Sequence, residues 1–239
     1  MHRHSIRVLA AVLALALPSI ARAQDASDSA AYRALIETPL GALPLPFDVA
    51  VTGERSRRVA VHARYGLMSL DNHEYIHNFG VGLDIPIGTE SIGLTAGYYW
   101  PDCNGSCSGH FMAAANLSEN LVRIRAGGGE DRATFNIGVD GEVGFARPTG
   151  ATLLSGNLAL PLSLVPARRD LRFVPYVVPG IGVGLVDTDS TEAGLLFTFA
   201  AGIGVVASHG FMANVGIRRA FLSTGNWLVG VGLTFGGDH

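Results

Sequence analysis

The stretch FNIGVDGEVGF, residues 135–145, alternates between two kinds of residue. Its odd positions are mostly bulky and apolar: Phe135, Ile137, Val139, Gly141, Val143 and Phe145. Its even positions are polar or glycine: Asn136, Gly138, Asp140, Glu142 and Gly144. Because successive side chains of a strand point to opposite faces, this period of two predicts a β-strand with one apolar face and one polar face.

The same alternation recurs along most of the chain. It is clearest in the windows 59–67, 79–87, 92–100, 197–205 and 227–235. Helical spacing fits none of these windows, and segments rich in Gly, Pro, Asn, Asp and Ser separate the apolar runs. Nine such connections join ten predicted strands.

The strand count depends on residues 110–126, where the apolar phase shifts between Leu117 and Val122. Either a bulge near residues 118–120 preserves one long strand, or a turn divides the region into two short strands. Ten strands return the C-terminus to the side where the N-terminus begins. We therefore favour the bulge and ten strands, within a range of eight to twelve.

The first 23 residues have the pattern of a secretory signal peptide. A basic start, MHRHSIR, precedes the apolar run VLAAVLALAL and the cleavage motif ARA, so Gln24 is the expected mature N-terminus. The alternative is a retained membrane anchor. We expect residues 24–55 to form an N-terminal periplasmic segment with a possible short helix and a Pro-rich linker, and residues 56–239 to form one domain.

The composition argues against a nucleic-acid-binding protein and against a protein with membrane-spanning helices. All 17 basic residues are Arg, and loss of three with the signal peptide leaves 14 against 20 acidic residues, a net charge of about −6 that disfavours nucleic acid as a partner. No run of 18 apolar residues follows the leader, so no membrane-spanning helix is expected. Only 15% of the residues are charged and 31 are Gly. Such an apolar exported chain needs another way to bury its apolar surface.

The composition of the weaker face decides which face meets lipid. In a soluble barrel this face would carry Lys, Glu, Thr and Gln, but here it carries mainly Gly, Ala, Thr and Asn with a few charges. The other face has aromatic residues near the strand ends: Tyr98, Trp100, Phe111, Phe145, Phe211, Phe221, Trp227 and Phe235. This layout is typical of a lipid-facing girdle. The sequence therefore predicts an all-β fold, a transmembrane antiparallel up-and-down β-barrel with Asp140 and Glu142 pointing into the lumen.

The chain resembles bacterial outer-membrane β-barrels of the small porin-like or OmpA-like kind. The resemblance covers about residues 56–235 and rests on the leader, the alternating strands and the closing strand NWLVGVGLTF. In the family an aromatic residue usually comes last, whereas here GGDH follows Phe235. The resemblance implies a monomer in the outer membrane, with outer-membrane lipids and the insertion machinery as partners.

Charged side chains on the inner face form the candidate site. They are His62, Arg64, Asp84, Arg123, Arg125, Asp140, Glu142 and Arg218, with Asn136, Asn157 and Asn214 beside them. Because isolated buried charges are costly, we expect Arg64 to pair with Asp84, and Arg123 or Arg125 to pair with Asp140 or Glu142. These groups either form a structural ion-pair network or line a narrow ion path. The Gly and Ala of the late strands either accommodate large side chains or leave a slot.

Two further groups lie in predicted loops. Cys103 and Cys107 are the only cysteines, and a disulfide is the expected pairing in an exported protein. The alternative is a zinc site with His73, His77 and His110, although the spacing matches no established zinc pattern. We expect no metal and no cofactor.

The stretch DNHEYIH, residues 71–77, could supply acid–base groups for a rim enzyme, but no G-x-S-x-G motif is present. The leading expectation is a non-enzymatic barrel with a structural or narrow-pore role that passes ions or small solutes. The alternatives are an outer-membrane protease or lipid-modifying hydrolase, and a soluble exported lipid-binding barrel with reversed faces.

Overall fold

The computed structural model describes residues 58–69, 75–102, 109–127, 133–147, 152–167, 170–187, 191–207, 210–220 and 227–236. The described strands are β1 (Ala60–Ser69), β2 (Tyr75–Ile87), β3 (Glu90–Asp102), β4 (His110–Ala126), β5 (Ala133–Ala146), β6 (Thr152–Ala159), β7 (Leu162–Val165), β8 (Leu171–Asp187), β9 (Thr191–Ala207), β10 (Phe211–Ala220) and β11 (Trp227–Phe235). Within these ranges, no helix has the length and hydropathy that a transmembrane helix needs.

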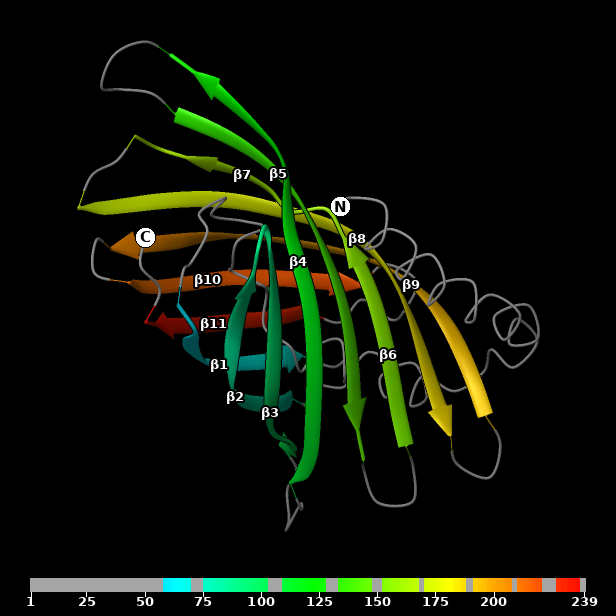
Figure 1. The fold of residues 1–239 in the computed structure, drawn as a ribbon. Coiled ribbons are helices and arrows are strands. Elements are labelled where there is room, and N and C mark those ends of the chain that lie inside the picture. The colour runs from blue at the N-terminus through cyan, green and yellow to red at the C-terminus, as the bar shows by residue number, and fades with distance from the viewer. Residues whose placement is uncertain are drawn as a thin grey trace.

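The strands form one closed antiparallel sheet (Figure 1). Apart from β6 and β7, strands that are consecutive along the chain pair with each other. The first strand, β1, pairs with the last, β11, so neither has a free edge. This closure satisfies the backbone hydrogen bonds that lipid could not satisfy. The predicted up-and-down barrel is confirmed.

The short strands β6 and β7 lie end to end and together occupy one strand position of the barrel. We call such a strand position a stave. Asp140 faces Ala159 of β6 and Ile137 faces Leu162 of β7, so β5 crosses both strands without a change of register. The interruption falls at Pro161, which has no backbone N–H to donate. The ladder continues on either side of it, because Gly138 N donates to Pro161 O at 2.8 Å and Leu160 N donates to Pro179 O at 2.9 Å. The barrel therefore has ten staves, as predicted.

Strand β4 confirms the predicted bulge. It is one strand of 17 residues, and its register against β5 shifts between Asn120 and Val122. The extra residue is Leu121, one position beyond the expected range. The bulge restores the outward direction of the apolar residues, because Val122 faces the outward residue Ile137 and Ile124 faces Phe135.

Burial confirms which face is outside. Along β5 the side chain of Val143 is 49% exposed, whereas the neighbouring Glu142 is only 7% exposed and Asp140 is fully buried. The same contrast holds around the barrel: most exposed large side chains are apolar, and polar side chains are buried in the interior. A soluble barrel would have the opposite arrangement, so the reversed-face alternative is wrong. The structure is a membrane barrel whose apolar wall faces lipid.

The two ends of the barrel differ. Ala60 and Phe235 lie at one end, here called the terminus end, and Ser69 and Trp227 lie at the opposite end, here called the loop end. Outward aromatic residues occur at both ends. Tyr98, Trp100, Phe111, Phe145 and Trp227 lie toward the loop end, and Phe211 and Phe235 lie at the terminus end with ring centroids 5.2 Å apart. Phe221 lies outside the described residues.

Candidate functional site: the barrel interior

A chain of hydrogen bonds joins three neighbouring strands inside the barrel. His62 of β1 is 2.9 Å from Asp84 of β2 through Nδ1, and 2.8 Å from the Thr95 hydroxyl of β3 through Nε2. The prediction that Asp84 pairs with Arg64 is wrong, because its carboxylate binds His62. The register explains why Asp84 binds His62 instead of Arg64. Asp84 lies opposite Ala60, and the next inward residue of β1 after Ala60 is His62, whereas Arg64 is one inward residue farther away.

The order carboxylate, imidazole, hydroxyl is one that hydrolases use to activate a nucleophile. Here, however, the His62 side chain is 1% exposed and Thr95 is 7% exposed. A catalytic hydroxyl must reach a substrate, whereas a buried polar group mainly needs a hydrogen-bond partner. The geometry of His62, Asp84 and Thr95 therefore fits a structural role.

A second group of polar side chains crosses the interior. Glu142 of β5 and Arg218 of β10 approach to 3.9 Å although their strands are not neighbours in the sheet, and both side chains are buried. Asn157 of β6 joins them. In the amide orientation that satisfies its neighbours, its oxygen accepts from Arg218 Nη2 at 3.2 Å and its nitrogen donates to the Thr198 hydroxyl at 3.3 Å. Glu142 and Arg218, both predicted site residues, are thus brought together.

Arg123 and Arg125 occupy a different place from the one expected. Both share the inner face with Asn136 and Thr134, but their side chains are exposed. The reason is that β3 stops pairing at Glu119, so the last residues of β4 extend beyond β3 at the terminus end. These two arginines are therefore exposed rather than buried, and their pairing with Asp140 or Glu142 stays a prediction.

Small residues in the wall make room for the interior side chains. Gly82 lies directly opposite His62, Gly202 lies opposite Tyr176, and Gly232 lies opposite Asn214. A Cβ atom on Gly82 would overlap the His62 ring and the Leu94 carbonyl oxygen. On Gly202 it would lie 2.5 Å from the Tyr176 hydroxyl. Of the late-strand glycines, Gly202 and Gly232 therefore accommodate a neighbouring side chain instead of leaving a slot.

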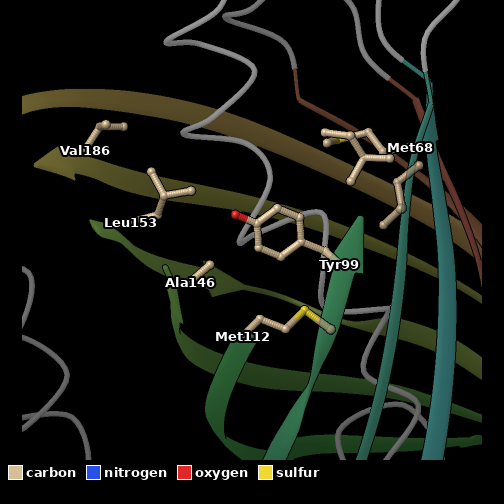
Figure 2. Close-up of a cluster of buried hydrophobic side chains, with 8 residues drawn as sticks. Met68, Tyr99, Met112, Ala146, Leu153 and Val186 are labelled. Carbon is tan, nitrogen blue, oxygen red and sulfur yellow. The ribbon is translucent and has the colours of Figure 1, made fainter. Parts of the chain in front are cut away.

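The loop end of the interior is apolar. Eight buried side chains, here called the apolar ring, form a cluster on the inner face of eight strands (Figure 2): Met68, Ile76, Tyr99, Met112, Ala146, Leu153, Val186 and Leu228. Tyr99 projects from β3 toward Leu153 and Ala146 (Figure 2). The sequence analysis missed this ring. Its signal was present, because the inward positions become apolar at the loop end of the eight strands that carry it.

A second apolar cluster lies inside the barrel toward the terminus end, on β6 to β10. Its members are Ala159, Val165, Val174, Tyr176, Val178, Ala200, Val206 and Met212. On β5 to β10 the polar side chains, among them Glu142, Asn157 and Arg218, form a middle layer between the two apolar clusters, whereas on β1 to β4 polar side chains such as His62 continue to the terminus end. Asp140 belongs to this layer, and its Oδ1 accepts from Asn116 Nδ2 at 3.1 Å.

Two histidines of the alternative zinc site, His77 and His110, lie on opposite faces of the wall. His77 points outward, where the Tyr65 hydroxyl lies 2.7 Å from its Nδ1, whereas His110 points inward beside Tyr99, with ring centroids 5.3 Å apart. In the part of the chain that the structure describes, no three His, Cys, Asp or Glu side chains gather as metal ligands would.

Several predictions fall on residues that the structure does not describe. They are the signal peptide at residues 1–23, the segment at residues 24–55, the Cys103–Cys107 disulfide, and the proposed acid–base groups Asp71, His73 and Glu74.

Comparisons with known proteins give a likeness of fold. No protein-family model and no curated protein matches the chain. It is similar to the solved outer membrane enzyme PagL, with 13% identity over 74% of this chain and 98% of that chain and a TM-score of 0.39. It is similar to the β domain of the Bordetella autotransporter BrkA at 12% identity, 74% and 98% coverage and a TM-score of 0.45. It is also similar to Ail, the attachment invasion locus protein of Yersinia pestis, with 11% identity over 74% of this chain and 96% of that chain and a TM-score of 0.32. At these identities and TM-scores the likeness establishes neither family nor function.

Proposed function

We propose that this protein is a bacterial outer-membrane barrel with a closed interior and a structural role in the cell envelope. An apolar outer wall with aromatic residues near both ends suits insertion into a bilayer. The leader and the closing strand favour the outer membrane, with the insertion machinery and outer-membrane lipids as partners. Because β1 and β11 complete the barrel within one chain, a monomer needs no partner strand to close its sheet.

The observation that carries the closed state is the apolar ring. Leu153, Ala146 and Val186 are fully buried even though they face the interior of a barrel, which means that other side chains cover them. Water wets such a constriction poorly, so the ring opposes the passage of ions. Deeper inside, the contact of Glu142 with Arg218 spans the polar layer.

The polar middle layer favours a second candidate, a narrow pore that opens only when the ring moves. Asp140, Glu142, Arg218 and His62 would then line the ion path. The two candidates differ in the conductance of the unmodified protein.

Planar-bilayer conductance of the purified protein separates them. We expect no steady conductance from the wild type. A Tyr99→Ala/Leu153→Ala variant, which removes bulk from the ring, should show channel events. The matched control is Tyr99→Phe, which removes only a hydroxyl that has no hydrogen-bond partner among the described residues, and this variant should stay silent. Stable conductance by the wild type would refute the closed barrel and support the pore.

We also propose that the protein is not an enzyme and that the His62 hydrogen bonds serve stability. The buried position of His62 and Thr95 supports this assignment. A His62→Asn variant should therefore unfold more readily while peptide and lipid substrates remain unconverted by both wild type and variant. Turnover by the wild type that His62→Asn abolishes would contradict the proposal.

A further inference from the structure

A cation lies on the lipid-facing surface at the loop end. Arg219 of β10 points outward, and its guanidinium carbon is 4.9 Å from the ring centroid of Trp227 on β11. The register of the two strands places these residues opposite each other. The indole face therefore holds the guanidinium at the level of the aromatic girdle, where lipid headgroups begin.

A second polar group lies farther along the same surface. His77 of β2 stacks on Trp100 of β3, with ring centroids 5.5 Å apart and planes 7° apart. The Tyr65 hydroxyl is 2.7 Å from His77 Nδ1. When this hydroxyl donates to Nδ1, the proton of the neutral imidazole is on Nε2, which can donate to a further acceptor.

The register places the two groups in one strip. Trp227 faces Ser69 of β1, Ser69 faces Tyr75 of β2, and Tyr75 and His77 are successive outward positions. Arg219 on β10 and His77 on β2 are three strands apart and differ by one outward position along the strand. The distance between them is therefore on the order of 15 Å. We call Arg219, Trp227, Tyr65, His77 and Trp100 the rim strip. It spans a width of only a few lipid headgroups.

We propose that the rim strip binds anionic lipids in the leaflet at the loop end, with the Arg219 guanidinium on the phosphate of one lipid and His77 Nε2 on that of a neighbouring lipid. Arg matches the geometry of phosphate oxygens, and anionic headgroups lie at the depth of the aromatic girdle. The chain as a whole has more acidic than basic residues, so its net charge would not attract such lipids and a local site is needed. The proposal depends on membrane insertion but not on whether the barrel conducts.

The two tryptophans of the chain, Trp100 and Trp227, both belong to the strip, so their fluorescence reports on it directly. The full chain would be reconstituted in phosphatidylcholine vesicles that contain either dibrominated phosphatidylglycerol or dibrominated phosphatidylcholine, whose bromines quench tryptophan on contact. In a Trp100→Phe variant, we expect quenching at Trp227 to show a preference of about fivefold for the anionic lipid, the size expected for one arginine at an anionic surface.

Adding Arg219→Gln to this variant should abolish the preference. Adding Arg147→Gln instead should preserve it, because Arg147 is exposed at the end of β5, on a different side of the barrel. In a Trp227→Phe variant, His77→Asn should lower the preference at Trp100. Heat-modifiable gel mobility would verify that each variant is folded.

Equal quenching by the two lipids, or a preference that survives Arg219→Gln, would overturn the proposal while leaving the membrane barrel intact. Quenching by neither lipid would contradict the lipid-facing assignment itself, so the two failures are distinguishable.

Discussion

Individual residues in the interior depend on partners that lie far away in the sequence. His62 binds Asp84 and Thr95, which lie 22 and 33 residues further along the chain, and Glu142 meets Arg218 across the barrel. The alternating pattern correctly placed each of these residues on the inner face. It could not supply the partners, because an inward charge can reach several strands and the choice depends on register and on the width of the barrel.

The contact between Glu142 and Arg218 can be measured with a double-mutant cycle. Removal of one charge takes a charged partner from the other, which stays buried, so Arg218→Met or Glu142→Leu should lower the free energy of unfolding by about 3–5 kcal/mol. The double variant should lose less than the sum of the two single variants. The measurement is urea unfolding of the barrel in lipid vesicles.

Arg219→Met provides the matched control for this cycle. Arg219 is the next residue of β10 but points to the outer face. Its substitution should show no coupling with Glu142→Leu. Strictly additive effects of Arg218→Met and Glu142→Leu would mean that the two side chains do not interact in the folded protein.

Single strands were predictable because their two faces differ along the whole length. In β5 every inward position from Asn136 to Ala146 is buried, and the outward positions are apolar or glycine. The bulge in β4 was also visible as a change of apolar phase. The break at Pro161 was not predicted as a feature of one stave, although the proline gives its physical cause.

The lipid-facing surface of β5 leads to a prediction that depends on depth. Val139 lies outward near the middle of the strand, so Val139→Arg should cost about 2–4 kcal/mol of folding free energy in a bilayer. Ile124→Arg should cost about 1 kcal/mol or less, because Ile124 lies at the terminus end beyond the last residue of β4 that pairs with β3. Urea titrations of both variants in vesicles would test this. Equal costs at the two positions would show that β4 and β5 do not cross the bilayer as assigned.

For the whole molecule, closure between β1 and β11 is the decisive contact. Deletion of residues 227–239 would expose the edges of β1 and β10, each with a row of backbone groups that lipid cannot satisfy. We expect this truncated chain to lose the heat-modifiable band of the folded barrel on gels. Deletion of residues 237–239 alone should retain the band, because it leaves the ladder of β11 complete. A folded band from the longer deletion would mean that the barrel closes without β11.

The sequence by itself determined the strands, the direction of their faces and the number of staves. These properties follow from the local period of two and from the types of residue on each face, which neighbouring positions suffice to define. Only the tertiary structure decided that the interior is layered, that the apolar ring covers its loop end, and that Glu142 meets Arg218 while Arg123 and Arg125 remain exposed. Those contacts join strands distant in the chain, and they form only where the register and closure of the barrel bring side chains to the same height.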